Sequence, residues 1–290
     1  MTPHTSDRVG PLLRQRIKAV FRRLPKALAG SEEDLHQMRV AARRLRVALP
    51  LLARAPQGRR VRRSLRLLRG LTRTGGLSRD RDVGVALFEE ELGRSGLTPA
   101  RGVLRRRLKA ARARSRTRMA EALLDLEIAR LRRDLRALTR RGDGLFVVVG
   151  RLREVRDERG AEALALVAAE GQAFDHVQLH RLRRRVRGLR YAAELFAALK
   201  GQVPPAAAEF RTLQDQLGII HDNYVLSEWF ARQAAACRGR GESAVAQEAA
   251  AFQASFLEAS RAQHRAFLAL PPEEVVRRAL ASMGQSRPAA

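Results

Sequence analysis

The sequence has a single cysteine, Cys237, and only four lysines among its 290 residues. One cysteine excludes an internal disulfide and provides no cluster of thiolates for a metal ion. No apolar stretch approaches the roughly 20 residues that a membrane-spanning helix requires. Residues 1–10 also lack the apolar segment of a secretion signal. We therefore expect a soluble, cytoplasmic protein that does not bind membranes.

Arginine, alanine and leucine dominate the composition instead. Lysine and arginine together number 57 against 30 acidic residues, which gives a formal charge of +27, and 45% of the residues are hydrophobic. That hydrophobic content is enough for a core, and the apolar residues recur at helical spacing, so the sequence predicts an all-α protein. The excess of positive charge attracts polyanions, whether nucleic acid, an anionic membrane or an inorganic phosphate chain.

An internal repeat divides the chain into two halves. The segment His36–Arg46 has a counterpart in His180–Arg190, at an offset of 144 residues, and Leu71–Val83 has one in Leu213–Val225. We place the seam at the glycine-rich break at residues 142–144. The predicted units are residues 8–142 and 143–280, with about four helices each, and a flexible tail at 281–290.

Glycine and proline indicate where the helices begin and end. The pair Gly75-Gly76 predicts a break in the first half. Thr98 and Pro99 predict a helix start, with a capping threonine followed by a proline at the first helical position, and this helix is expected to run on to the seam.

The repeated segments predict two helices that are basic on one side and apolar on the other. At about 100° per residue, one arc of each helix collects the cations. The arcs consist of His36, Arg39, Arg43 and Arg46, and of His180, Arg183, Arg187 and Arg190. Residues 35–79 carry thirteen arginines and no acid, residues 101–120 nine cations and no acid, and residues 181–193 six arginines and no acid. An ordinary solvated face mixes both signs of charge, so these rows favour a polyanion-binding role.

These residues resemble the CHAD family, the conserved histidine α-helical domain. The resemblance rests on the two blocks that begin at His36 and His180 and on Leu217, Gly218 and Asp222, and it covers roughly residues 8–280. It implies two pseudo-symmetric four-helix bundles from an internal duplication, with basic helices that line a central cleft. It also implies inorganic polyphosphate as the partner and, in some bacteria, localisation at polyphosphate granules.

Thirteen residues are the predicted polyphosphate-binding candidates. Ten lie in the repeated blocks, namely His36, Arg39, Arg43, Arg44, Arg46, His180, Arg183, Arg184, Arg187 and Arg190. Lys109, Arg112 and Arg116 form a second row that would bind if the repeated blocks did not. Gly188 stands where the family usually has a cation, so this position is left out. The two motif histidines are expected either to contact phosphate oxygens or to cap their helices.

Other chemistry has weaker support in the sequence. His176 and His180 lie four residues apart, but no carboxylate or cysteine stands at a matching third position for a metal ion, so we predict no metal. Asp80, Asp82 and Asp222 follow turn-like segments and are interpreted as helix caps. We find no Walker-type loop, nucleophile elbow or Glu-x-Glu-x-Lys signature, so we predict a protein that is not an enzyme and needs no cofactor.

Nucleic acid is the main alternative partner, because phosphate contacts dominate affinity for either polyanion. The sequence shows no recognisable helix-turn-helix or zinc finger. Its few aromatic residues, such as Trp229, Tyr191 and Tyr224, are not interleaved with the basic blocks, as base stacking would require. The sequence therefore favours polyphosphate over nucleic acid.

Overall fold

The computed structural model describes residues 8–139, 143–169, 173–202 and 205–284, and within these residues it contains ten α-helices and no strands. The all-α prediction is confirmed. The helices are α1 (Val9–Leu28), α2 (Glu32–Leu52), α3 (Arg59–Ser95), α4 (Pro99–Leu124), α5 (Ile128–Leu138), α6 (Leu145–Ala169), α7 (His176–Lys200), α8 (Pro205–Arg238), α9 (Ser243–Ala269) and α10 (Pro272–Gly284).

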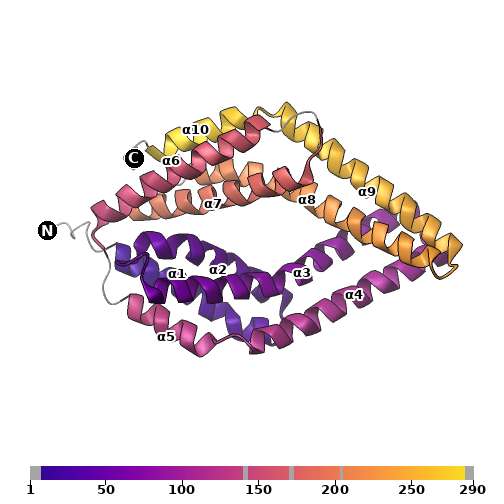
Figure 1. The fold of residues 1–290 in the computed structure, drawn as a ribbon, viewed down its shortest axis with the longest axis horizontal. Coiled ribbons are helices and arrows are strands. Elements are labelled where there is room, and N and C mark those ends of the chain that lie inside the picture. Colours follow the sequence, from indigo (N-terminus) through magenta and orange to yellow (C-terminus); the bar gives the residue numbers. More distant parts are fainter. Residues whose placement is uncertain (1–7, 140–142, 170–172, 203–204, 285–290) are drawn as a thin grey trace.

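The first five helices form one side of the molecule and the last five form the other (Figure 1). Helices α2 and α7 contact each other where the two sides meet, and the long helices α3, α4, α8 and α9 extend to the far end. Each half of the described chain therefore has five helices, one more than the sequence predicted. The additional break falls at Asp125–Glu127 between α4 and α5, where neither glycine nor proline marks it. The duplication itself stays a prediction.

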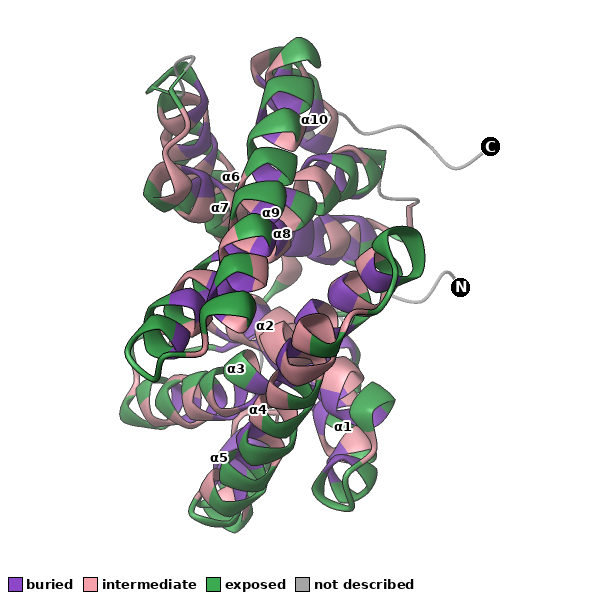
Figure 2. Ribbon diagram, turned by 90° about the vertical axis from the view of Figure 1, so that its right-hand side faces the viewer, coloured by how far each residue is buried: buried purple, intermediate pink, exposed green. Residues whose placement is uncertain are grey.

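The larger of two hydrophobic cores contains the apolar sides of α2 and α7. Met38, Ala42 and Leu45 on α2 are fully buried, as are Leu182 and Val186 on α7. The structure therefore confirms the predicted apolar side of each helix, which packs into the core. In Figure 2, buried residues lie where helices face one another and exposed residues follow the outer surfaces.

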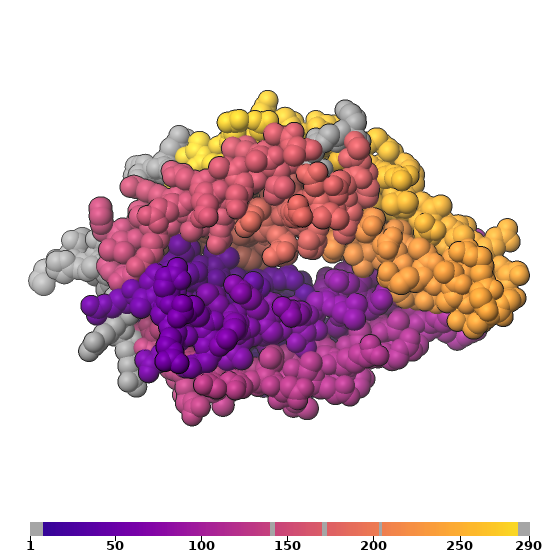
Figure 3. Space-filling model, in the orientation of Figure 1, coloured from indigo at the N-terminus to yellow at the C-terminus, as the bar shows by residue number. Residues whose placement is uncertain are grey.

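A second core joins the two halves at the far end, where α3, α4, α8 and α9 pack together. Phe88 of α3 makes edge-to-face contacts with Phe230 of α8 and Phe252 of α9, each with ring centroids 4.9 Å apart. Such aromatic pairs add about 1 kcal/mol each beyond the area that they bury. The halves thus meet at both ends, and an opening remains between them in the space-filling view (Figure 3).

The helix starts follow ordinary capping chemistry. Ser31 caps α2 by accepting the backbone N–H of Asp34, and Asp175 caps α7 by accepting two backbone N–H groups. Thr98 caps α4 and Pro99 occupies the first turn, so this predicted start is confirmed. These caps leave His36 and His180 one turn inside their helices, so neither histidine has a capping role.

Two local predictions about α3 and α8 are wrong. Asp80 and Asp82 lie inside α3, and Asp222 lies inside α8, so these carboxylates do not cap helices. The pair Gly75-Gly76 also lies within α3 and does not break it. The glycines that suggested turns allow close packing instead, as the site below shows.

The predicted boundaries fall at loops only in part. Gly142 of the seam lies outside the described residues, and α6 begins at Leu145, directly after Gly144. Helix α10 extends to Gly284, so the predicted flexible tail is wrong for residues 281–284, while residues 285–290 lie outside the described part. Among the described residues, none of the helices combines the length and apolar character needed to cross a membrane.

Candidate functional site

A cleft of about 740 Å³ lies between the two halves, and both basic helices line it. Helix α2 contributes Arg43 and Arg46, and α7 contributes Arg184 and Arg187. These four predicted binding residues, far apart in the sequence, are therefore brought to one surface. We call this hollow the central cleft.

Four further arginines, which the sequence did not single out, line the central cleft. They are Arg69 of α3, Arg159 of α6, and Arg181 and Arg185 of α7. Arg159 lies over Gly188, where an added Cβ would come within 3.3 Å of its guanidinium. The cation that the family pattern leads one to expect at position 188 is thus replaced by one from α6. Only the packing of α6 against α7 reveals this substitution.

The positive charges of the central cleft are largely unpaired. Glu162 is the one acid among the described residues that line it, and Arg185 pairs with it at 3.0 Å. Arg43, Arg184 and Arg187 make no ion pair or side-chain hydrogen bond within the described part of the chain. Burial lowers the pKa of Arg43 and of Arg187, and the positive charge of Arg43 lowers the pKa of Arg187 further. These shifts show that the two guanidinium groups are crowded together and partly removed from water, although arginine stays charged near neutral pH.

Arg39 occupies a close contact between α2 and α3. It is 4% exposed, and its Nη1 donates a hydrogen bond to the backbone oxygen of Gly75. A Cβ at position 75 would lie 2.6 Å from Cδ of Arg39. A side chain at this position would overlap Arg39 unless the arginine moved, so glycine allows the two helices to approach this closely.

Arg183 occupies the corresponding place in the second half. Its Nη2 lies 4.0 Å from the position that a Cβ of Gly218 would take, as Nη2 of Arg39 lies 3.9 Å from that of Gly76. The Nε of Arg183 is buried and has no hydrogen-bond partner among the described residues. Each basic helix therefore passes an arginine over a glycine of the next helix, but only Arg39 is held there by a backbone acceptor.

Two carboxylates lie beside these arginines, one turn further along α3 and α8. Burial raises the pKa of Asp80, although Arg39 and Arg183 oppose that effect. Burial also raises the pKa of Asp222, to about 6, and Asp80 adds to the rise. The negative charge of Asp80 thus acts on Asp222 across the two halves. The sequence predicted that these acids cap helices. Their position beside the arginines depends on how the helices pack, which the sequence does not show.

A cluster of histidines lies next to Arg183. His176 Nε2 and His221 Nδ1 are 3.1 Å apart, and the His180 ring centroid lies 5.0 Å from that of His221. Burial and the neighbouring positive charges lower the pKa of His180, that of His176 to about 4 and that of His221 to about 3. These rings are therefore neutral near pH 7. His221 is a third histidine that the sequence placed outside the site.

This cluster differs from a metal centre. Within the described residues, no group of three or more histidine, cysteine or acidic side chains is arranged to hold a metal ion. The His176 ring stacks on Tyr224 at a centroid distance of 3.7 Å. Arg183 lowers the pKa of all three histidines, and the same positive charge opposes a bound cation.

His36 is half-buried at the matching position of the first half. Burial lowers its pKa, and Arg79 of α3 lowers it further. Two of the three acids that precede His36 in the sequence, Glu32 and Glu33, have other partners. Glu33 accepts a hydrogen bond from Gln37, and Glu32 pairs with Arg116 of α4.

Three further residues of the predicted blocks have partners within the protein. Arg44 forms a two-pronged ion pair with Glu194 of α7 at 2.7 and 3.0 Å, and Arg190 lies 3.3 Å from the same carboxylate. Both guanidinium groups also lie over the Tyr191 ring, at 5.6 and 5.1 Å from its centroid. Arg46 donates to Thr72 at 3.1 Å but still lines the central cleft. Arg44 and Arg190 therefore contribute to packing between the halves.

The second predicted row, on α4, does not line the central cleft. Lys109 pairs with Glu89 at 2.8 Å, and Arg116 pairs with Asp82 at 2.7 Å. Arg112 makes no ion pair within the described residues. Acids of α3 thus pair with two of the three residues of this row.

Two of three comparisons with known proteins identify the same fold. The family model for the CHAD domain matches residues 11–231. Among solved structures, PptA from Streptomyces chartreusis is similar at 18% identity, with 97% of this chain and 99% of that chain covered and a TM-score of 0.68. The CHAD domain from the plant Ricinus communis is similar at 22% identity, with 95% and 91% covered and a TM-score of 0.65. No curated protein sequence is detectably similar. The chain belongs to the CHAD domain family.

Proposed function

We propose that this protein binds inorganic polyphosphate in the central cleft without acting on it chemically. The observation that carries the proposal is the meeting of α2 and α7, which places Arg43 and Arg187 in one cleft with unpaired charges. Members of the CHAD domain family are linked to polyphosphate, which agrees with this assignment.

The chemistry of the cleft suits a chain of phosphates. Guanidinium groups donate two parallel hydrogen bonds to phosphate oxygens, and such charge-assisted bonds are about twice as strong as neutral ones. Eight arginines line the cleft and come from four helices, so an extended ligand can contact several of them at once. Affinity then grows with the number of phosphates in contact, because each contact also releases counterions.

Binding rather than catalysis follows from the charges around the two carboxylates. Proteins that transfer phosphoryl groups use metal ions to neutralise the developing charge. Here the positive charges of Arg39, Arg43 and Arg183 all act on Asp80. Such surroundings attract phosphate and repel a metal cation, so we propose no enzymatic step and no cofactor.

Nucleic acid is the alternative ligand, and the aromatic residues argue against it. Single strands are usually bound by aromatic rings on which the bases stack. Tyr191 lines the cleft but is 5% exposed, and Arg44 and Arg190 cover its ring. Trp229 is 3% exposed. Rings that are covered in this way favour recognition of phosphate over recognition of bases.

Localisation follows from the proposed ligand. A protein that binds polyphosphate in the cytoplasm is expected to collect at polyphosphate granules where a cell forms them. A fluorescent fusion should co-localise with granules, and the fusion with Arg43→Gln and Arg187→Gln should spread through the cell. Equal granule localisation of both fusions would contradict this part of the proposal.

A competition titration tests the ligand directly. Labelled long-chain polyphosphate is bound to the protein at physiological salt and displaced by unlabelled polyphosphate, duplex DNA, single-stranded DNA or RNA, all at equal phosphate concentration. We expect polyphosphate to displace the label most efficiently. Displacement by DNA or RNA at an equal or lower phosphate concentration would favour the nucleic-acid function instead.

A further inference from the structure

A second basic groove lies between α4 and α8, outside the central cleft. It consists of two adjoining hollows of about 250 and 360 Å³, which share Ala111, Arg114, Trp229 and Gln233. Helix α3 adds Leu77 and Arg81 to the smaller hollow. We call the two hollows together the α4–α8 groove. None of its residues lines the central cleft.

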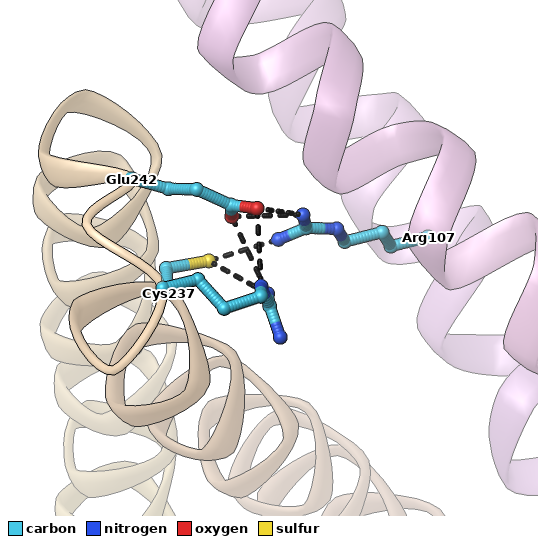
Figure 4. Close-up of polar contacts among 4 residues, drawn as sticks. Arg107, Cys237 and Glu242 are labelled. Atoms are coloured by element: carbon cyan, nitrogen blue, oxygen red, sulfur yellow. Dashed lines mark hydrogen bonds and ion pairs between the residues drawn. The ribbon is translucent and has the colours of Figure 1, made fainter.

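Two arginines of the larger hollow, Arg107 and Arg240, belong to a polar network with Glu242 and Cys237 (Figure 4). Arg107 of α4 donates to both carboxylate oxygens of Glu242 at 2.8 Å and to Sγ of Cys237 at 2.9 Å. Arg240 also donates to Glu242, at 3.0 Å. This network ties α4 to the turn between α8 and α9, and it leaves this end of the groove with little free positive charge.

The smaller hollow keeps its charges unpaired. Arg81, Arg114 and Arg118 make no ion pair or side-chain hydrogen bond within the described part of the chain. Arg232 lies 3.7 Å from Glu228, and both side chains are about half exposed, so this pair is weak. Burial lowers the pKa of Arg81, and Arg232 and Arg114 lower it further. Four arginines thus line the hollow together with the nearly buried Trp229, and the acids near them are Glu228 beside Arg232 and Asp80 beside Arg81.

The groove begins next to the main site. Arg81 directly follows Asp80, and Asp80 lies among the arginines that α2 and α7 direct to the centre of the molecule. Helix α3 lines both hollows, with Arg69 in the central cleft and Arg81 in the groove, so a phosphate chain that extends along α3 can reach both. The groove and the central cleft are separate hollows that α3 connects.

We propose that the α4–α8 groove is a second binding segment for the same phosphate chain, which it holds where a long chain leaves the central site. This inference rests on the proposed function, because it takes the ligand from it. Arg81, Arg114 and Arg118 would contact phosphate oxygens, with Arg232 at the rim. Short chains fill the central cleft alone, whereas long chains occupy both segments.

Tryptophan fluorescence reports on this groove specifically, because Trp229 is the single tryptophan of the chain and lines both hollows. The full-length protein is titrated with tripolyphosphate and with long-chain polyphosphate while fluorescence and binding heat are recorded. We expect both ligands to release heat, but only the long chain to change the emission of Trp229.

Variants separate the two segments. Arg81→Gln, Arg114→Gln and Arg118→Gln combined should leave tripolyphosphate binding unchanged, lower the affinity for the long chain by about tenfold or more and abolish the fluorescence change. The matched control removes three exposed arginines that make no ion pair in the described residues, by Arg133→Gln, Arg153→Gln and Arg211→Gln. It loses the same formal charge and should keep the fluorescence change and most of the affinity. Circular dichroism checks that both variants remain helical.

The outcomes distinguish the two proposals. If the wild-type protein binds neither ligand, the proposed function fails and this inference fails with it. If the wild-type protein binds both but the groove variant keeps the full advantage for the long chain, the groove is not a binding segment and the central cleft stands alone.

Discussion

Helices α4 and α7 both carry a row of cations, but different side chains surround the two rows. Each contains a run of cations without a single acid. On α4, Arg105 and Lys109 share Glu89, and Arg101 pairs with Glu248 of α9 at 2.9 Å. On α7, Arg184 and Arg187 line the central cleft and have no such partners among the described residues. The same sequence pattern is thus paired with acids along part of α4, whereas on α7 it lines a cleft with a single acid among the described lining residues.

Under the proposed function, a row of cations binds an anion only where the fold places no acids against that row. Folding places acids of α3 and α9 against α4, so its ion pairs stabilise the structure modestly. The cleft arginines instead repel one another and are partly removed from water, which costs the unliganded protein free energy. A polyanion removes that cost, so it binds where the repulsion is greatest.

The largest expected effect comes from replacing cations with glutamine, once in the central cleft and once on α4. Arg43→Gln combined with Arg187→Gln should weaken polyphosphate binding by about a hundredfold or more, because each charge-assisted bond contributes about 1.5–3 kcal/mol. Arg105→Gln combined with Lys109→Gln removes the same formal charge from α4. It should weaken binding by less than about threefold, since only a distant charge is lost.

Isothermal titration calorimetry measures both variants against the wild type at one salt concentration. Equal losses in the two variants would mean that net charge and not the cleft determines affinity. A larger loss in the α4 variant would move the site to that helix.

Among the described residues, Glu194 is the acid that pairs with arginines of both α2 and α7, so its replacement leaves more unpaired charge beside the cleft. Glu194→Gln leaves Arg44 and Arg190 without their carboxylate. Because these groups are largely buried, we expect a loss of about 2 kcal/mol in the free energy of unfolding, measured by urea denaturation. The affinity for polyphosphate should rise at the same time. A variant that is destabilised and also binds more weakly would show that Glu194 orders the site and does not compete with the ligand.

Substitutions at Gly75 and Gly218 test how firmly Arg39 and Arg183 are held where they cross the neighbouring helix. Gly75→Ala forces the tightly held Arg39 to move, so it should destabilise the fold by about 1–3 kcal/mol. Gly218→Ala meets Arg183 at an ordinary contact distance of 4.0 Å, so the gain in helix propensity should leave its stability equal or up to about 1 kcal/mol higher. Thermal or urea unfolding of both variants provides the test. Equal destabilisation would mean that Arg183 is held as rigidly as Arg39.

The smallest effect concerns pH and the acids of the site. The pKa of Asp222 is raised to about 6, so its carboxylate is mainly charged at pH 7.5 and mainly neutral at pH 5.5. Affinity for polyphosphate should therefore rise severalfold as the pH falls through this window. Asp80 acts in the same direction because its pKa is also raised. The neighbouring His176, His180 and His221 have lowered pKa values, and protonation that a bound polyanion promotes would add to the effect.

Asp222→Asn is the control for this pH dependence. The variant carries no charge at position 222 at any pH, so it should bind at pH 7.5 nearly as tightly as the wild type does at pH 5.5. An unchanged pH dependence in the variant would assign the effect to the histidines or to Asp80.

The sequence predicted the parts of the site that depend on local periodicity. Met38 and Leu45 face the core and Arg43 faces the cleft because positions on one helix are fixed by its turn of 3.6 residues. The repeat also identified the correct pair of helices, since Arg43 and Arg187 belong to matched blocks. These arguments need no knowledge of how helices pack.

Features that depend on packing between helices could not be predicted in this way. Arg159 reaches the cleft only because α6 lies on α7, above Gly188. Gly75-Gly76 carries the composition of a turn, but its role is to admit Arg39 against a continuous α3. Likewise, Asp222 has the sequence surroundings of a cap, and only the position of α8 places it beside Arg183. In each case the partner lies in a distant part of the chain.

The salt dependence of binding tests most directly whether α2 and α7 hold one ligand together. For the wild type and for the Arg43→Gln, Arg187→Gln and doubly substituted variants, the logarithm of the association constant is plotted against the logarithm of the salt concentration. If both arginines contact the same phosphate chain, each substitution should reduce the steepness of the slope by about 0.7, and the double variant by the sum. A slope that stays at the wild-type value when either arginine is removed would contradict a shared site between the two helices.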